Sequence, residues 1–210
     1  MGRRGLPAPI EAKRPHVVTI VTGGGRGLLA TAFGLPDSPD VRLFVAVRPP
    51  ETVIDVVASL PRPEHPGVRW TTRAQWHLTL RFLGEVDDPG PVAAALAAAP
   101  LHRCTAVTGP RVTVLGRGVL VVPVEGLGEL AAAVALATAG HGGRPETRPF
   151  RGHLTLARAP RTDVRSLVGA PVEASFAVDE VQLVRSHLGA GGARYEDLFV
   201  RRLDRVAHGP

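Results

Sequence analysis

The chain has 210 residues, 44% of them hydrophobic, so it can build a sizeable core and is not a disordered chain. Its net charge of +6 favours a polyanionic partner such as RNA or DNA. The single cysteine, Cys104, excludes an internal disulfide and a cysteine-based metal site, and we expect a reducing cytoplasm. No stretch approaches the length of a membrane span, so we expect no membrane partner.

Residues 1–40 differ in composition from the rest of the chain. They are rich in Gly, Pro and Arg and hold one short apolar stretch, 17–21, followed by a glycine run at 23–25. A glycine run after a strand can bind a dinucleotide pyrophosphate, but a crossover helix and a ribose-binding acid are missing here. We therefore predict a flexible extension over 1–40, a folded domain over 41–204 and a tail over 205–210.

From residue 41 the hydrophobic periodicity and the turn residues predict an α+β domain. Helices are predicted at 51–60, 88–99, 127–139 and 163–168. Strands are predicted at 42–47, 68–70, 75–83, 104–107, 111–115, 119–124, 150–157, 174–185 and 194–202.

The tetrapeptide His-Leu-Thr-Leu occurs twice, starting at His77 and at His153, 76 residues apart. Alternate side chains of a strand share a face, so each copy presents one imidazole and one hydroxyl to one surface while its leucines point to a core. Matching strand contexts at this spacing predict a duplicated fold. We expect two lobes related by a pseudo-twofold axis, with antiparallel sheets and outer helices around a central cleft.

Two histidines facing each other suit the hydrolysis of a phosphodiester. One imidazole can accept the proton of the attacking water while the other donates a proton to the leaving oxygen. The threonine hydroxyls can donate to the non-bridging phosphate oxygens. By alternation, Arg81 shares the face of His77 and Arg151 shares the face of His153, and two guanidinium groups favour phosphate.

A metal site is the competing use of two histidines. Such sites usually take three or more protein ligands, and the motif faces carry hydroxyls and arginines without a carboxylate or a cysteine. No nucleophile-elbow motif supports a Ser-His-Asp arrangement. We therefore expect no metal and no other cofactor.

These residues resemble the two-histidine (2H) phosphoesterase superfamily, defined by paired His-x-Thr-x motifs. Within it the similarity is to the RNA 2′,3′-cyclic phosphodiesterases, historically called 2′-5′ RNA ligases, and it covers residues 41–202. The segments 42–47, 76–85, 150–158 and 183–186, with the later Arg194 and Tyr195, carry the resemblance. Because the opening strand of that family lies at the start of its chain, the resemblance also implies that residues 1–40 are over-annotated and that Val41 is the true start.

The resemblance implies an order of roles. RNA ending in a 2′,3′-cyclic phosphate would be opened by water to a 2′-phosphate end, with His77 as proton donor to the leaving 3′ oxygen and His153 as proton acceptor. Thr79 and Thr155 would hold the phosphate. Arg158 matches a family arginine, although strict alternation places it opposite His153, so the strand must bend before it.

Further expectations concern substrate and assembly. Phe44 and Phe150 are candidates for stacking on a base, or else core aromatics. Gly152 replaces the proline common before the second histidine and is expected to loosen the start of that strand. The same cleft also suits a small cyclic nucleotide or 2′-5′ ligation, and a non-catalytic module that binds RNA ends is the alternative of another class. We expect a monomer without an obligate protein partner.

Overall fold

The computed structural model of the protein describes residues 17–18, 31–33, 41–159, 168–189 and 192–205. The expectations for the N-terminal extension lie outside these residues except at β1 (Val17–Val18) and β2 (Thr31–Phe33), two short strands at the edge of the sheet. The tail beyond residue 205 and the helix predicted at 163–168, apart from Val168, also lie outside them.

Antiparallel strands dominate the described chain and form one sheet in the order β1-β2-β12-β11-β3-β5-β9-β8-β6-β10. Two short strands lie off this path, β4 beside β9 and β7 beside β8. The remaining strand bounds are β3 (Val41–Val47), β4 (Arg69–Trp70), β5 (Leu78–Val86), β6 (Cys104–Thr108), β7 (Thr113–Leu115), β8 (Val119–Glu125), β9 (His153–Arg158), β10 (Ala174–Val178), β11 (Glu180–Gly189) and β12 (Gly192–Arg202).

The sheet consists of two lobes that meet at the two motif strands. Within the described chain β5 and β9 pair only at Leu78 and Leu154, the second residue of each motif copy. A twofold axis through this pair relates the two copies, which confirms the predicted two-lobed α+β fold. Each lobe also borrows a strand from the other half of the chain, since β11 pairs with β3 and β6 pairs with β8. The first residues of β6 and β11, Cys104 and Glu180, are again 76 residues apart.

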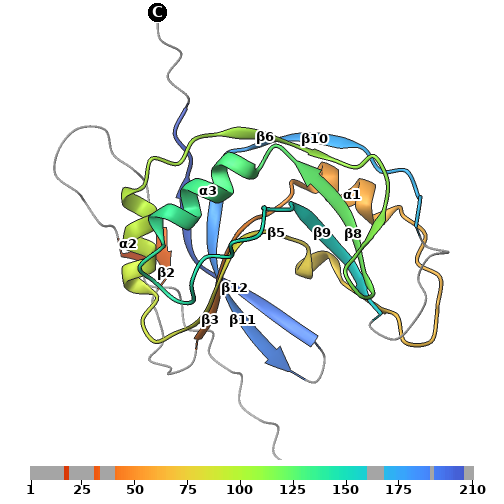
Figure 1. Ribbon diagram of the computed structural model, residues 1–210, viewed down its shortest axis with the longest axis horizontal. Helices are drawn as coiled ribbons and strands as arrows, with labels where there is room; N and C mark the ends of the chain where they lie inside the picture. The colour runs from red at the N-terminus through yellow and green to blue at the C-terminus, as the bar shows by residue number, and fades with distance from the viewer. Residues whose placement is uncertain (1–16, 19–30, 34–40, 160–167, 190–191, 206–210) are drawn as a thin grey trace, which may run out of the picture.

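Three α-helices of the described chain cover the outer faces of the lobes (Figure 1). They are α1 (Glu51–Ala58), α2 (Gly90–Ala98) and α3 (Gly128–Ala137). Apolar residues at helical spacing, such as Val53 and Val57 in α1, are buried in one continuous core. The helices also cross between halves, because α1 packs on β10 whereas α3 packs on β5. The two lobes therefore cannot separate without exposing core.

Both motif strands contain a β-bulge at the same position of the repeat. Across from β3, the pairing of β5 skips Leu80, and across from β8, the pairing of β9 skips Leu156. A bulge inserts one residue and reverses the alternation that follows it. Position five after each histidine, Phe82 or Arg158, therefore returns to the exposed cleft side.

Some predicted boundaries differ from the structure. The single strand predicted over 174–185 is two strands, β10 and β11, which separate at Asp179 and pair in different lobes. The strand predicted from residue 150 begins at His153, so the alternation applied to Arg151 has no basis there. Within the described chain we find no helix that has both the length and the hydropathy to cross a membrane.

Candidate active site

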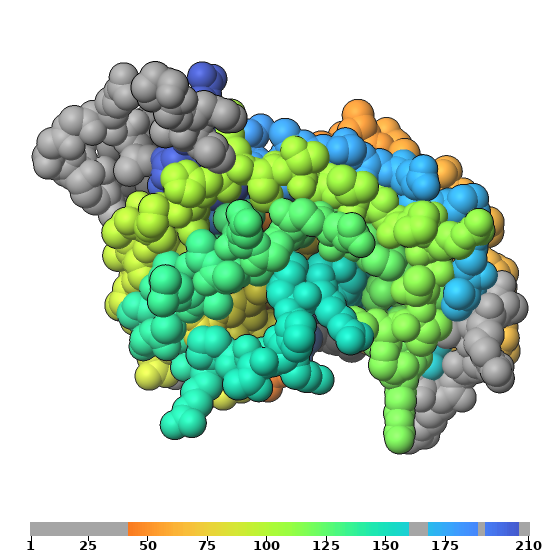
Figure 2. Space-filling model, turned by 45° about the horizontal axis from the view of Figure 1, so that its top comes forward, coloured from red at the N-terminus to blue at the C-terminus, as the bar shows by residue number. Residues whose placement is uncertain are grey.

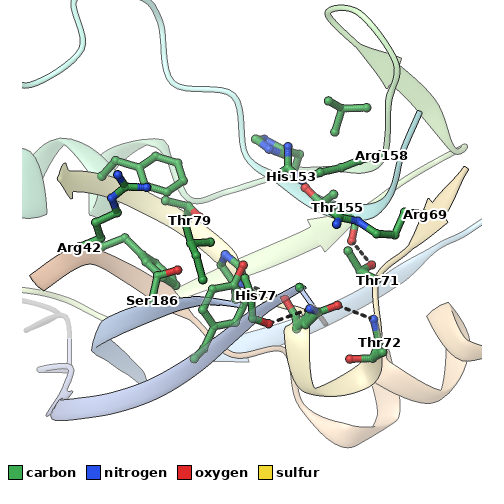
Figure 3. A pocket seen from close by; sticks show the side chains of 18 of the residues that line it. Arg42, Arg69, Thr71, Thr72, His77, Thr79, His153, Thr155, Arg158 and Ser186 are labelled. Carbon is green, nitrogen blue, oxygen red and sulfur yellow. Dashed lines mark hydrogen bonds between the residues drawn. The ribbon is translucent and has the colours of Figure 1, made fainter. Parts of the chain in front are cut away.

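A pocket of about 820 Å³ lies where the two lobes meet, and both motifs line it. Figure 3 shows His77, the residue before β5, and Thr79 of β5 facing His153 and Thr155 of β9. The predicted pair of imidazoles and pair of hydroxyls are thus brought together in one cavity. The remaining described lining comes from β3, β4, the turn before β5, later residues of β5 and β9, Leu115 of β7, Val119 of β8 and the β11–β12 hairpin.

The two imidazole rings are held in the same way. The Nδ1 atom of His77 lies 2.7 Å from the carbonyl oxygen of Gln75, and that of His153 lies 2.8 Å from the carbonyl oxygen of Arg151. A carbonyl only accepts, so Nδ1 carries the proton in both rings. Nε2 is therefore the atom that each ring has left to accept or donate a proton in the pocket.

His77 is enclosed more tightly than its counterpart. Its ring lies 4.8 Å, between centroids, from Phe44 and also 4.8 Å from Tyr195. Burial lowers the pKa of His77 from 6.5 to about 4; its bond to the Gln75 carbonyl opposes the shift, and the charge of Arg48 adds to it. His77 is therefore neutral at pH 7 in the free protein. Burial also raises the pKa of the Tyr195 phenol, which remains a hydrogen-bond donor.

Gln75 connects this histidine to the hairpin wall of the pocket. Its side-chain amide donates to the carbonyl of Ala193 in β12 over 2.8 Å and accepts from the amide of Thr72 over 3.0 Å. The short helical turn Arg73–Gln75 is closed by these bonds. The carbonyl that orients His77 is consequently fixed by contacts on both sides.

Thr71 ties the two motifs together through hydrogen bonds. The indole Nε1 of buried Trp76, the residue before His77, donates to the Thr71 hydroxyl over 2.9 Å. That hydroxyl lies 2.7 Å from the carbonyl oxygen of Thr155 and 2.8 Å from that of Leu156, the bulged residue of β9. The relative placement of the two motifs thus depends on a side chain outside both of them.

Three arginines line the pocket, at its two ends. Figure 3 shows Arg42 beyond Thr79 at one end and Arg69 and Arg158 beside Thr155 at the other. The bend expected before Arg158 is the bulge at Leu156. Because no Asp or Glu is among the described lining residues, the pocket favours anions.

The predicted position of Arg81 in the cleft is wrong. Its side chain is buried against the turn after α3, where it donates to the Thr138 hydroxyl and to the carbonyls of Ala135, His141 and Gly143. The bulge at Leu80 turns it to the face opposite His77, an effect that strict alternation does not include. Arg81 therefore holds α3 and the following loop on β5.

Three other predicted contacts are placed differently from expectation. Phe44 is 2% exposed and packs behind His77, so it offers no free face to a base. Phe150 and Arg151 line a neighbouring groove rather than this pocket. Gly152 does not loosen the start of β9, because a Cβ there would lie 2.3 Å from the carbonyl oxygen of Val124 and the Val124 amide donates to the Gly152 carbonyl.

The exposed aromatic of the pocket is Phe82, which sequence reasoning missed. Its side chain is 65% exposed and lines the pocket at the Arg42 end, in contact with the ring of Phe44 at 5.9 Å. Alternation from His77 assigns it to the opposite face. Its spacing was the available signal, since Phe82 follows His77 by the same five residues by which Arg158 follows His153.

The comparisons with known proteins bear on the family and the fold. A search of curated proteins gave no match. The structure superposes on TT0787 of Thermus thermophilus with a TM-score of 0.64 and 28% identity, covering 77% of this chain and 97% of that one. It superposes on E. coli LigT complexed with 3′-AMP with a TM-score of 0.64 and 26% identity, covering 78% and 98% of the two chains.

E. coli LigT complexed with phosphate gives a TM-score of 0.63 at 26% identity, with 79% of this chain and 99% of that chain covered. The sequence model of the 2′-5′ RNA ligase superfamily matches residues 47–190, which include both motifs. The chain therefore belongs to the 2′-5′ RNA ligase superfamily of two-histidine phosphoesterases.

Proposed function

We propose that the protein hydrolyses the 2′,3′-cyclic phosphodiester at the end of an RNA to a 2′-phosphomonoester, by metal-independent acid–base catalysis. His153 accepts the proton of the attacking water, and His77 donates a proton to the leaving 3′ oxygen. Thr79 and Thr155 donate to the non-bridging oxygens of the phosphate, where charge builds in the transition state.

The observation that carries the proposal is the matched orientation of the two imidazoles. Each ring keeps its Nδ1 proton on a backbone carbonyl and turns Nε2 to the shared pocket. In-line displacement at phosphorus places the nucleophile and the leaving group on opposite sides of the reacting atom. Two proton-transfer groups related by a twofold axis suit that geometry, and one of them alone does not.

The protons balance in a single displacement. The water oxygen bonds to phosphorus and loses a proton to Nε2 of His153, while the bond from phosphorus to the 3′ oxygen breaks. That oxygen takes the proton from Nε2 of His77. The histidines end with exchanged protonation states and return to their starting states through solvent.

The low pKa of His77 sets a condition on this assignment. A ring with a pKa of about 4 carries no second proton at pH 7, so the donor role requires an anion to arrive first. A phosphate oxyanion beside the ring favours its charged form and raises its pKa. Arg69 and Arg158 supply the attraction that brings the anion into the pocket, together with Arg42, whose guanidinium also pairs with Glu85 over 3.2 Å.

The pocket also provides a place for the terminal base. The exposed ring of Phe82 lines the pocket, and Phe82 lies opposite Phe44 in the pairing of β3 with β5. An aromatic face of this kind accepts any base by stacking. The complex of the relative E. coli LigT with 3′-AMP supports a nucleotide as the ligand.

The ligand set of the pocket supports a reaction without a metal. Its described lining holds two imidazoles and no carboxylate or thiol. Nowhere in the described chain do three or more His, Cys, Asp or Glu side chains come together as a metal-binding group. Two imidazoles fall short of the three or more protein ligands that catalytic zinc sites use.

The test is turnover of a short RNA that ends in a 2′,3′-cyclic phosphate, with the product identified as the 2′- or 3′-phosphate by mass and selective phosphatase treatment. We expect a 2′-phosphate, an unchanged rate in EDTA and a kcat lowered at least about 10²-fold in the His77→Ala, His153→Ala double variant. Turnover of a cyclic mononucleotide, compared with turnover of the RNA, measures how much of the RNA the pocket needs. Binding of the RNA end without turnover would identify a non-catalytic module instead.

A further inference from the structure

The two motif histidines differ in what lies beside them. His153 lines a second groove of about 470 Å³ in addition to the main pocket. Figure 2 shows the surface hollowed there, between the projecting turn of β7 and β8 and the segment that leads into β9. Of these two cavities His77 lines only the main pocket, and the rings of Phe44 and Tyr195 enclose it. A charged residue next to these two rings is therefore close enough to His77 to affect its ionisation.

Asp197 lies in the same row of the sheet as Phe44. Val184 of β11 pairs with Phe44 of β3 on one side and with Asp197 of β12 on the other. Directly paired residues share a face, and Asp197 also shares the face of Tyr195, two residues before it in β12. The Asp197 carboxylate therefore stands on the concave face, beside the two rings that enclose His77.

Arg48 reaches this carboxylate from the end of β3. Its guanidinium lies 2.6 Å from an Asp197 oxygen, and 27% and 35% of the two side chains are exposed. Because β11 lies between β3 and β12 in the sheet, the ion pair spans one whole strand. Partial burial reduces the screening of the pair by salt. Neither residue lines the main pocket, so any effect of the pair on a substrate passes through other groups.

The charges that act on His77 are all positive. Burial is the largest cause of its low pKa, and the hydrogen bond to the Gln75 carbonyl opposes that shift. Three cationic groups lower the pKa further, first Arg48 from the end of β3 and then His153 and Arg158 from β9. His153 and Arg158 line the pocket, where a phosphate can pair with them, whereas Arg48 does not. Arg48 is thus the cation that acts on His77 from behind the pocket wall.

We propose that Arg48 and Asp197 are positioning residues for the proposed proton donor, His77. Asp197 holds the Arg48 guanidinium beside the ring, where its positive charge keeps the ring neutral until a phosphate anion enters the pocket. The anion then favours the imidazolium, so the donor is charged only when a substrate is present. Asp197 also offsets part of the charge of Arg48, so that the anion outweighs the rest. The inference rests on the proposed function, in which His77 donates a proton.

The two halves of the pair should shift the ionisation of His77 in opposite directions. Arg48→Met removes a repulsive charge and should raise the pKa of His77, by up to about tenfold in its protonated fraction at a given pH. Asp197→Asn leaves Arg48 unpaired and should lower that pKa. The double variant should lie between Arg48→Met and the wild type, and Arg48→Lys, which keeps the charge, should stay close to the wild type. NMR titration of the His77 ring without substrate measures all four variants.

Turnover of an RNA with a cyclic phosphate end gives a second measurement. Because His77 must be protonated to donate, kcat should fall as the pH rises through the pKa of His77 in the complex. This alkaline limit should move to higher pH in Arg48→Met and to lower pH in Asp197→Asn, with KM little changed. Arg103→Met is the matched control, since Arg103 pairs with Asp179 over 3.2 Å outside both cavities. It should keep the wild-type pKa of His77 and the wild-type kcat.

Shifts of the same sign in Arg48→Met and Asp197→Asn would overturn the inference, because the loss of either half would then only loosen the pocket wall and expose the ring. An unchanged pKa of His77 in Arg48→Met would overturn it as well. Opposite shifts, together with no turnover of a cyclic end by the wild type, would instead support the effect of the pair on His77 and contradict the proposed function.

Discussion

The two motif strands share a backbone design but differ in the surroundings of their histidines. β5 and β9 carry the same tetrapeptide, the same bulge after the threonine and the same contact from Nδ1 to a carbonyl two residues back. Yet His77 packs between Phe44 and Tyr195, whereas His153 borders two cavities.

Duplication therefore supplies two equivalent imidazoles, and the side chains around them make the imidazoles unequal. The fifth residue after each histidine also differs between the two copies, since it is the aromatic Phe82 in the first and Arg158 in the second. A duplicated backbone can position two proton-transfer groups symmetrically. A reaction in which one group donates a proton and the other accepts one needs the surroundings of the two groups to differ. The following variants test how far the symmetry and its breaking extend.

The largest effect is expected when either imidazole is removed. His77→Ala and His153→Ala should each lower kcat by about 10²- to 10⁴-fold, because each loses one proton transfer. The double variant should be little worse than the slower single variant, since both groups act in one step. His65→Ala, in an exposed loop outside the pocket, should keep wild-type turnover of a cyclic-phosphate RNA. Near-normal turnover by either single variant would break the paired scheme.

The enclosure of His77 should appear as a pH dependence of stability. Between pH 6.5 and pH 4 the unfolded chain takes up a proton at His77 that the folded protein does not, so the free energy of unfolding should decrease as the pH falls. A pKa lowered from 6.5 to about 4 corresponds to a loss of about 3 kcal/mol, complete below pH 4. Urea unfolding at pH 7 and pH 4 measures it.

His77→Gln should lose about 3 kcal/mol less than the wild type over this pH window, because it has no imidazole to titrate. His65→Gln should follow the wild-type curve. NMR titration of the His77 ring, with and without inorganic phosphate, should show its pKa rising when the anion binds. If the free energies of unfolding of wild type and His77→Gln depended on pH in the same way, burial would not lower the pKa of His77.

The fifth residues after the two histidines, Phe82 and Arg158, should contribute to RNA binding in different ways. Phe82→Ala should raise KM for a cyclic-phosphate RNA by about tenfold at any salt concentration, because stacking is worth about 1–3 kcal/mol per base. Arg158→Ala should raise KM mainly at low salt, where its charge is least screened. Steady-state kinetics at two ionic strengths separates the two effects. If both variants responded to salt alike, the asymmetry of these positions would have no functional meaning.

The smallest effect is expected at the link between the two motifs. Thr71→Val should lower the free energy of unfolding by about 1–2 kcal/mol, because it leaves the Trp76 indole N–H buried without an acceptor. Thr71→Ser keeps the hydroxyl and should restore most of that stability in urea unfolding. A valine variant as stable as the wild type would show that the lobes are held together without this contact.

The local spacing of apolar residues predicted most of the helices and strands, because that spacing reflects which side chains are buried. Period-2 and period-3.6 spacing located strands and helices to within a few residues, as at β3 and α1. The misplacement of Arg81 has a single cause, the bulge at Leu80, which turns the residues after it to the other face until a second register shift of β5 at Leu83. A bulge depends on the partner strand, so the residues of one strand do not reveal it.

Phe44 and Phe82 show the same limit within the pocket. Both are phenylalanines on strands that meet at the cleft, so residue type does not distinguish them. The pairing of β3 with β5 puts the two rings opposite each other, but the His77 and Tyr195 rings cover Phe44, which is 2% exposed, whereas Phe82 is 65% exposed. Which aromatic is free to meet a base is therefore a property of the assembled sheet.

The sequence by itself determined the duplication, the identity of the two imidazoles and two hydroxyls, and the two-lobed fold that brings them together. These follow from a repeated tetrapeptide and from strand periodicity, both of which are local. The tertiary structure alone decided which arginines and aromatics face the cleft, how deeply His77 is buried and that a second groove meets His153. Those properties depend on contacts between strands far apart in the chain, such as Leu78 with Leu154.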